Sequence, residues 1–415
     1  MPIRVLPPSG APRVLAAAQL SNSVGDGAYY VSSALYFTRV VGLSPTQIGL
    51  GLAVAWGIGS VAGVPLGALA DRWGPRAASA LLAVATAAAV ASFLFVGSFA
   101  LFLAAAVVYA VAQCGLAAAR QALLAGLVAP AERTDVLAHL QSTLNAGLAI
   151  GAALSGLALR YDTAEAYRAV FALDAVSFVL CAAVLLRLPV VARSTAARGD
   201  GEPRLAVLRD RPYAVVTLLN AVLLLRMPLL SLAIPLWTVE RTDAPGWLVS
   251  ALFVLNTLAV MVFQVRLARG VTGLVAAARA VRHSGLVMFG SCAVFAVSAA
   301  RLAPWAAAAV LVVGAALHVV AEMRHSAGSW QIGLALAPAR HVGQYQGFYG
   351  TGVPVARTLG PLLLTWLLVV GGVPGWLVLG AVFLAASLLM GPAVRWAERS
   401  VRPGGVPGTA RPSLA

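Results

Sequence analysis

The sequence predicts an all-α membrane protein with twelve spanning helices, and its composition and patterning are the observations behind this prediction. Of the 415 residues, 60% are hydrophobic and only 10% are charged, with a mean hydropathy of +0.89, which excludes a soluble domain. The hydrophobic residues form long runs rich in Ala, Leu, Val and Gly, without the alternation of membrane strands, so helices are favoured over a β-barrel. About 250 hydrophobic residues, at about 20 per span, supply roughly twelve helices.

Each helix is expected where an apolar run lies between short turns that contain Gly, Pro or Arg. The first run follows Arg13 and has no convincing small-residue cleavage site, so it is predicted to be an uncleaved span and not a signal peptide. The first six spans are expected at residues 14–38, 46–68, 77–97, 99–127, 137–159 and 169–188. The second six are expected at residues 212–238, 246–268, 284–300, 305–335, 344–370 and 375–393.

A break between the sixth and seventh runs divides the chain into two halves. This break carries five arginines together with Gly and Pro residues, which is typical of a cytoplasmic linker. The Pro-, Gly- and Arg-rich end of the chain is predicted to be disordered. The predicted domains are an N-terminal six-helix bundle at 1–188, a linker at 189–211, a C-terminal six-helix bundle at 212–393 and a cytoplasmic tail at 394–415.

A faint internal repeat supports the division into two halves. Pro45 before the second span corresponds to Pro245 before the eighth, at an offset of 200 residues. An Ala-Pro-Ala sequence after the fourth span, at 129–131, corresponds to the same sequence after the tenth span, at 337–339, at an offset of 208. Nearly constant offsets indicate two parallel repeats that are related by an axis along the membrane normal.

The strong positive charge is explained by membrane orientation. The formal net charge is +15, and all 29 basic residues are arginines, which gather mainly in short turns between apolar runs and not in one patch. We therefore expect contact with anionic lipid and no nucleic-acid partner. The turns on the same side as the N-terminus carry most of these arginines, so both termini are predicted to be cytoplasmic.

The most specific motif is a polar turn between the second and third spans, formed by Gly67, Asp71, Arg72, Gly74 and Arg76. Gly67 permits the close approach of another helix, and Asp71 can face the positive end of a neighbouring helix. The arginines hold the turn on the cytoplasmic side. The pattern Gly-x-x-x-Asp-Arg-x-Gly-x-Arg resembles the signature loop of the major facilitator superfamily of transporters.

This resemblance implies two pseudo-symmetric six-helix bundles around a central cleft, in the inner membrane of a bacterial cell. The fifth span resembles the antiporter motif of drug-exporting facilitators, with Gly147, Gly151 and Gly156 at glycine positions and an alanine in place of the motif's proline. Gly360 and Pro361 lie at nearly the matching place in the eleventh span. Such small residues let helices pack and rock closely, although ordinary packing in an Ala-rich membrane protein gives the same pattern.

Two charges near the middle of spans are candidates for coupling. A charge inside a span costs about 2.5–3.5 kcal/mol on insertion scales, so each one needs a partner or a function. Asp26 in the first span and Arg226 in the seventh are separated by the repeat offset of 200, which places them at one depth on opposite sides of the cleft. We predict that they pair, and that a proton or the substrate competes for this pair. The alternative is a static ion pair or satisfaction by local hydroxyl groups.

The tenth span carries His318, Glu322 and His325, which share one helical face. A proton relay with Glu322 as the titrating group is favoured over a metal site, and no metal is predicted. The alternative is that Glu322 is satisfied by its helix neighbours and by Arg120 of the fourth span.

Three further charges lie inside the spans. Arg120 resembles the arginine that many facilitators carry in the fourth span, and Arg357 lies in the eleventh. Asp174 is assigned a supporting role, because the resemblance implies that the sixth span does not line the cavity.

The function predicted from the sequence is secondary active transport. No Walker loop, catalytic triad or Cys/His metal box is present, so neither an enzyme nor a cofactor is expected. We predict proton-coupled export of a small amphipathic or drug-like compound by alternating access, with the substrate, protons and membrane lipid as partners of a monomer. The alternative is an uptake permease for a small anion or nutrient, with Arg226 and Arg357 as anion contacts. A sensor or assembly factor built on the same fold is a third, less favoured prediction.

Overall fold

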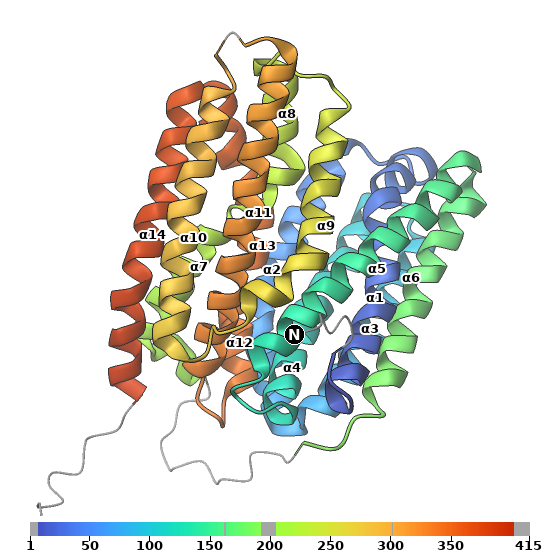
Figure 1. Cartoon of the computed structure of the whole chain (residues 1–415). Helices are drawn as coiled ribbons and strands as arrows, with labels where there is room; N and C mark the ends of the chain where they lie inside the picture. The colour runs from blue at the N-terminus through green and yellow to red at the C-terminus, as the bar shows by residue number, and fades with distance from the viewer. Residues whose placement is uncertain (1–6, 162, 192–204, 301, 402–415) are drawn as a thin grey trace, which may run out of the picture.

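The computed structural model describes residues 7–161, 163–191, 205–300 and 302–401 (Figure 1). All regular secondary structure within these ranges is helical, and the helices follow one another as twelve rods, which confirms the predicted fold class. Nine of the described helices are long and apolar enough to cross a membrane. The molecule is therefore a multi-pass helical membrane protein.

The first six rods are nearly uninterrupted. They are α1 (Ala11–Leu35), α2 (Pro45–Trp73), α3 (Pro75–Ser92), α4 (Phe99–Leu127), α5 (Arg133–Tyr161) and α6 (Ala164–Leu185). A π-helical turn, η1 (Tyr36–Val40), extends the first rod, and a 3₁₀ turn, η2 (Phe93–Phe95), extends the third.

In the second half of the chain, the seventh and eleventh rods are broken. The seventh rod comprises α7 (Arg211–Leu224), the π-helix η4 (Leu229–Ala233) and α8 (Ile234–Arg241). The eleventh rod comprises α12 (Val342–Gly350), α13 (Gly352–Leu364) and the π-helix η5 (Thr365–Val370). The other rods are α9 (Leu248–Ala268), α10 (Gly273–Val297), α11 (Pro304–Ala335) and α14 (Gly372–Val401). The break before η4 contains Pro228, which lacks the N–H that a helix interior needs.

Most helix ends differ from the sequence-based prediction by a few residues; α2, for example, runs to Trp73, so Asp71 and Arg72 lie in its last turns and not in the connecting turn. Three differences are larger or concern the predicted linker and tail. Helix α10 begins at Gly273, well before the predicted start of the ninth span at residue 284, because arginines in its first turns masked its apolar character. Residues 394–401 belong to α14 and are not disordered, while 402–415 lie outside the described residues. Within the predicted linker, Ala206–Arg209 form the 3₁₀ turn η3, and residues 192–204 lie outside the described part of the chain.

The turn between α2 and α3 is fixed by its sequence. Helix α2 starts with a capping box, in which the Ser44 side chain accepts from the Gln47 N–H and the Gln47 side chain accepts from the Ser44 N–H. Gly74 ends the helix with φ +98°, a conformation that favours glycine, and Pro75 opens α3. These residues place Asp71 at one end of the bundle.

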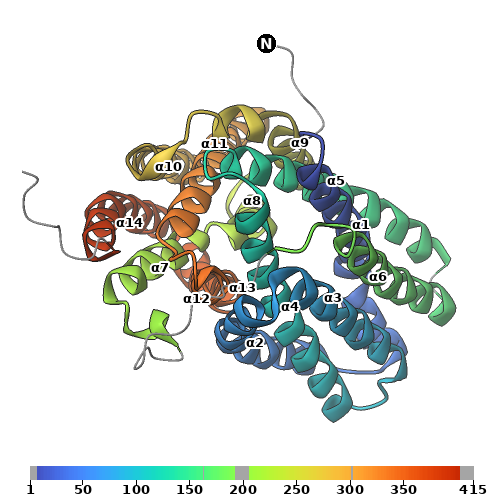
Figure 2. The same ribbon diagram turned by 90° about the horizontal axis from the view of Figure 1, so that it is seen from below.

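The helices pack into two groups. In the first, α1 packs on α5 and α6, and α4 packs on α2 and α3; in the second, α10 packs on α11 and α14, and α7 packs on α13 and α14 (Figures 1 and 2). The groups meet where α12 contacts α2 and α4 and where α5 contacts α9. We propose that these groups are the two predicted six-helix bundles, and we call them the N-bundle and the C-bundle.

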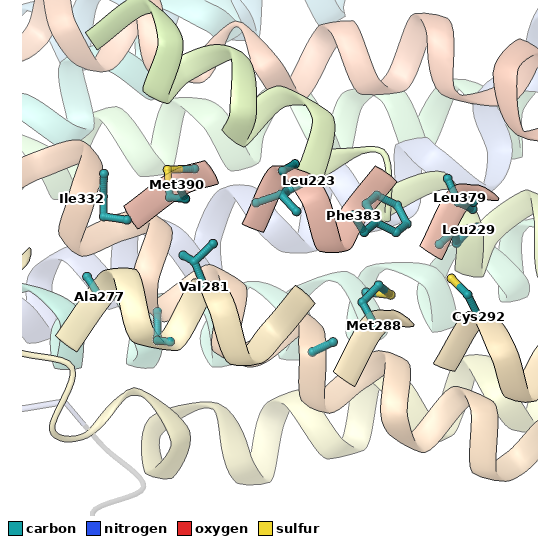
Figure 3. Packing of buried hydrophobic residues seen from close by; sticks show 14 of the residues in the cluster. Leu223, Leu229, Ala277, Val281, Met288, Cys292, Ile332, Leu379, Phe383 and Met390 are labelled. Carbon is teal, nitrogen blue, oxygen red and sulfur yellow. The ribbon is translucent and has the colours of Figure 1, made fainter. Parts of the chain in front are cut away.

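Each group has its own apolar core. In the C-bundle, Val281 and Met288 of α10 lie opposite Phe383 and Met390 of α14, with Leu223 of α7 beside them (Figure 3). The N-bundle has an aromatic core instead, which consists of Tyr29, Tyr36, Phe37, Phe93, Phe102, Tyr109, Tyr167 and Phe171. Apolar packing also continues across the interface, because Val64 of α2 and Ala138 of α5 belong to the cluster of the C-bundle and Leu334 of α11 packs in a cluster of the N-bundle.

Candidate functional site

A cavity of about 440 Å³ lies between the two bundles. Its lining comes from α1, α2, α4, α5, α7, α11, α12 and α13, so both bundles contribute to it. Its polar, aromatic and charged lining residues are Gln19, Asn22, Asp26, Tyr30, Trp56, Ser60, Gln113, Cys114, Arg120, Gln121, Asn220, Ser329, Trp330, Gln346, Tyr349, Thr351 and Arg357. Three of the six residues predicted for the cavity or for coupling, Asp26, Arg120 and Arg357, are therefore brought together here.

Asp26 and Arg120 are connected through one amide side chain. Asn22 lies one helical turn before Asp26 on α1, and its Nδ2 donates to Asp26 Oδ2 at 3.0 Å. Arg120 of α4 donates through Nη1 to Asn22 Oδ1 at 3.1 Å and through Nη2 to Gln19 Oε1 at 2.6 Å. The Arg120 guanidinium is thus bound by two neutral amide groups, and Asn22 bridges it to the Asp26 carboxylate.

The Asp26 carboxylate keeps one oxygen available. The residue is only 7% exposed, and among the described residues its Oδ1 has no hydrogen-bond partner. A buried carboxylate oxygen without a donor is costly, so a proton or a donor from a bound compound would stabilise it.

Arg357 enters the cavity from α13 of the C-bundle. Its guanidinium carbon lies 5.3 Å from the centre of the Trp56 ring and 5.8 Å from the centre of the Tyr30 ring, both of which belong to the N-bundle. These are cation–π distances. In the parts of the chain that the structure describes, neither Arg357 nor Arg120 forms a direct ion pair with a carboxylate.

Arg226 has a different partner from the one predicted. Its Nη1 lies 3.0 Å from Glu322 Oε1 in an ion pair, its Nε donates to His325 Nδ1 at 3.2 Å, and its Nη2 donates to Ser326 Oγ at 3.2 Å. The predicted pair between Asp26 and Arg226 is therefore wrong. The break after α7 directs Arg226 onto α11 of its own bundle, where Glu322 is the nearest acid. The same contact replaces the predicted partner of Glu322, Arg120.

The histidines of α11 do not form a metal site. His318 and His325 are buried, and within the described ranges His318 Nδ1 and His325 Nε2 have no hydrogen-bond partner. No group of three or more His, Cys, Asp or Glu side chains that could hold a metal occurs among the described residues. His318, Arg226 and Glu322 lie outside the cavity lining, so their assignment to the cavity is not supported.

The signature motif joins the two bundles at one end. Asp71 Oδ1 accepts from the N–H of Gly343 at 2.7 Å, and Asp71 Oδ2 accepts from the N–H of Gln344 at 3.0 Å, at the start of α12. A Cβ added at Gly67 would meet the carbonyl of Gly343. The carboxylate thus caps the positive end of α12, as predicted, and glycines on both helices allow the close approach. Arg72 is exposed beside this contact, and Arg76 is half-buried.

The glycines of the antiporter-like motif have mixed roles. A Cβ at Gly147 would meet Ser23 of α1, and one at Gly151 would meet the α1 backbone at Val24. Gly360 packs on the ring of Pro228 at the break of the seventh rod, and Pro361 lies inside α13. A side chain at Gly156 would meet nothing within 4 Å, so this glycine is not part of the predicted seam.

Several cavity residues escaped the sequence analysis. Trp56, Tyr30 and Asn22 line the cavity but read as ordinary span residues, because their direction depends on how each helix is rotated. On the other wall, Ser329 Oγ lies 2.8 Å from Asn220 Oδ1 and 2.9 Å from the Tyr349 hydroxyl. A search for uncharged polar side chains inside spans would have found Asn22 and Asn220. Asp174, as expected, lies outside the lining.

The chain is similar to one protein family and to several solved transporter structures. Residues 15–323 match the family model described as Major Facilitator Superfamily, whereas no curated protein matches the chain. A bacterial homologue of the iron transporter ferroportin, in an outward-facing state with soaked iron, superposes with a TM-score of 0.72 at 16% identity, over 94% of this chain and 99% of that chain. The human organic anion transporter MFSD10 (TETRAN) superposes with a TM-score of 0.69 at 17% sequence identity, over 91% of this chain and 98% of that chain. The transporter FucP in its outward conformation superposes with a TM-score of 0.66 at 14% sequence identity, over 93% of this chain and 98% of that chain. At these identities the likeness concerns the fold alone.

Proposed function

Because the chain belongs to the major facilitator superfamily, we propose that it is a proton-coupled secondary transporter that moves a small amphipathic anion by alternating access. The observation that carries this proposal is the charge of the cavity. The charged residues in the described lining are two arginines, Arg120 and Arg357, and one acid, Asp26. The excess of positive charge favours an anionic substrate, and the rings of Trp56 and Tyr30 suit an apolar or aromatic body.

This proposal changes the order of the two functions predicted from the sequence. Export of a drug-like compound was favoured there, and uptake of a small anion was the alternative. The cavity supports the alternative, with Arg357 as the anion contact. Arg226, the other contact predicted for an anion, is engaged by Glu322 and does not line the cavity.

The orientation follows from the arginine-rich turns. We propose that the end of the molecule with Asp71 faces the cytoplasm, together with both termini. At this end the bundles are joined by the Asp71 contacts and by a hydrogen bond of 2.9 Å from Thr134 Oγ1 of α5 to Gln331 Oε1 of α11. With this orientation, these contacts hold the two bundles together at the cytoplasmic end of the molecule.

Coupling follows from competition between two negative charges. The Asp26 carboxylate lines the same cavity as Arg120 and Arg357, so it competes with a substrate anion for these positive groups. Protonation of Asp26 removes this competitor and strengthens anion binding. By linkage, the bound anion strengthens proton binding to the same extent. A proton and the anion therefore bind together and cross in the same direction.

Reconstituted liposomes test the proposal. An inward-directed proton gradient should accelerate uptake of a radiolabelled aromatic carboxylate, and it should leave the matching primary amide unaffected. Asp26→Asn should still exchange the carboxylate between the two sides but should lose acceleration by the gradient. Undiminished acceleration in this variant would contradict coupling at Asp26, and equal transport of the amide would contradict the anionic substrate.

Export of a drug-like compound in exchange for protons is the second candidate. The packing of Gly147 and Gly151 on α1 supports it, because this is the seam that the antiporter-like motif predicts. The two candidates differ in cells: overproduction of an exporter lowers the cellular level of a labelled substrate, whereas overproduction of an uptake system raises it.

A further inference from the structure

Two grooves flank the first turns of α10, on the surface of the C-bundle away from the cavity. One lies between α10 and α14 and has a volume of about 430 Å³. The other lies where α9, α10 and α11 meet and has a volume of about 510 Å³. Arg279 lines both grooves, so they are two parts of one surface that wraps around α10. We call this surface the α10 groove.

The α10 groove is strongly basic. The arginines that line it come from four helices and the turn after α9; they are Arg266, Arg269, Arg279, Arg282, Arg324 and Arg395. His283 also lines it, and the acidic residue in the same lining is Glu398. Most of these arginines are exposed, and Arg324 is half-buried. Such a concentration of positive charge attracts an anion to this surface.

The position of these arginines goes beyond what orientation in the membrane requires. Topology is set by charges in the turns between spans. Arg279 and Arg282, however, lie six and nine residues inside α10, and Arg324 lies eleven residues before the end of α11. At 1.5 Å per residue, these positions lie about 9–17 Å from the nearest helix end. Their guanidinium groups can reach the lipid headgroups only because arginine side chains are long.

The same groove has apolar walls. Between α10 and α14 they are formed by Leu274, Val275, Ala278, Leu388, Pro392 and Val394. On the α14 side, the small residues Ser387 and Gly391 leave room in this groove. A ligand that fits here has an anionic group next to apolar chains, and it approaches from the membrane.

We propose that the α10 groove binds an anionic phospholipid, with its phosphate at Arg279 and Arg282 and its acyl chains along the wall between α10 and α14. Planar guanidinium groups match phosphate oxygens in a bidentate manner. Basic pockets between spans on the cytoplasmic side suit anionic headgroups. A free phosphate would satisfy the arginines but would leave the apolar wall unoccupied. The inference does not depend on the transported substrate.

Native mass spectrometry of the full-length protein in detergent tests this inference. The probes are phosphatidylglycerol, phosphatidylcholine with the same acyl chains, and glycerol phosphate without chains. Phosphatidylglycerol should bind at least about tenfold more tightly than the other two, since several arginines contribute about fivefold each. The double variant R279Q/R282Q should weaken phosphatidylglycerol binding by about 25-fold, to the level of phosphatidylcholine.

A matched control is R187Q, because Arg187 is an exposed arginine after α6, at the same end of the molecule but outside the groove. It should bind phosphatidylglycerol like the unchanged protein. If the double variant fails to fold, as seen from a lost thermal transition without lipid, the single variant R395Q should show a loss of about fivefold. Equal binding of the two lipids, equal binding of glycerol phosphate, or an equal effect of R187Q would each overturn the proposal.

Discussion

At the scale of residues, Arg357 is the side chain on which the cavity's chemistry depends. It is the charged lining residue from the C-bundle, and it lies over Trp56 and Tyr30 of the N-bundle. An anion bound to it would therefore touch both bundles at once. This position explains how occupancy of the cavity can influence the relative movement of the two halves.

Substitution of Arg357 tests this role. Arg357→Gln should weaken binding of an aromatic carboxylate by about tenfold to a hundredfold, because a charge-assisted hydrogen bond contributes about 1.5–3 kcal/mol. Arg357→Lys keeps the charge but loses the planar group that stacks on the rings, so we expect an intermediate loss. Isothermal titration of the purified protein measures both. A glutamine variant with unchanged affinity would show that the anion binds elsewhere.

The ion pair in the C-bundle makes a second prediction at this scale. Glu322→Gln leaves the guanidinium of Arg226 buried without its carboxylate, which should lower the free energy of unfolding by about 3 kcal/mol. We expect a loss at the low end of the range for buried ion pairs, because the Glu322 side chain is 22% exposed to solvent. Thermal unfolding in detergent measures the loss.

The double variant Arg226→Gln, Glu322→Gln provides the control for this pair. If the two side chains stabilise each other, the double variant should lose less stability than the sum of the two single losses. Additive losses would mean that His325 and Ser326, and not Glu322, hold the arginine in place.

The sequence identified these two charges as buried but did not identify their partners. The repeat offset placed Asp26 and Arg226 at matching positions of the two halves, and both are buried inside their rods. Their partners depend on how each helix is rotated and on the break after α7, and periodicity in an apolar span does not contain this information. Arg226 is paired within its own bundle, whereas Asp26 has a partner for only one of its two carboxylate oxygens among the described residues.

At the scale of elements, the contact between α2 and α12 holds one end of the molecule closed. Gly67 and Gly343 face each other there, and Asp71 caps the start of α12. The contact combines close backbone packing and one charged cap with apolar packing, because Val64 of α2 belongs to the same apolar cluster as Tyr345 of α12. Opening this end must therefore separate the cap and the packed side chains together.

Gly67→Ala should disturb this contact, because the added Cβ would meet the carbonyl of Gly343. We expect the end near Asp71 to open, at a cost of about 1–3 kcal/mol for the closed arrangement. Cys114 lines the cavity and is half-buried, so it serves as a native probe. Labelling by a membrane-impermeant maleimide from the Asp71 side should increase in vesicles of defined orientation.

Gly57→Ala is the matched control, since it lies on the same helix and its added Cβ would meet nothing within 4 Å. Its labelling should equal that of the unchanged protein. Equal labelling of both variants would mean that the glycine contact does not limit opening.

The elements were predictable where the sequence carries local signals and less so where packing decides. The capping box at Ser44 and the glycine at Gly74 mark the ends of α2. The break before Pro228 could have been read from the proline, but the continuous apolar run concealed it. At α10, three basic residues in the first turns lowered the local hydropathy, and the helix was expected to begin too late. These residues line the α10 groove.

At the scale of the whole molecule, the cavity lies between two groups of helices and is lined by both. The N-bundle supplies Asp26, Arg120, Trp56 and Tyr30, and the C-bundle supplies Arg357 and a neutral polar wall. Sequence composition, the repeat and the signature loop were sufficient to predict this architecture. They could not predict the sign of the cavity's charge, because that depends on which intramembrane charges face inward and which, like Arg226, face their own bundle.

The placement of the two arginines on different bundles leads to a final prediction about stability. An anion that binds between Arg120 and Arg357 links the bundles, so it should stabilise the folded molecule as a whole and not one half of it. At a concentration of 100 times its dissociation constant, such a ligand adds about 2.7 kcal/mol to the free energy of unfolding. Thermal unfolding with an aromatic carboxylate should show one transition that moves upward with ligand concentration. Asp26→Asn should increase this shift at neutral pH, because the competing carboxylate is removed, and Arg357→Gln should abolish it. A shift of equal size with the primary amide, or a smaller shift in the Asp26 variant, would contradict an anion site that couples the two bundles.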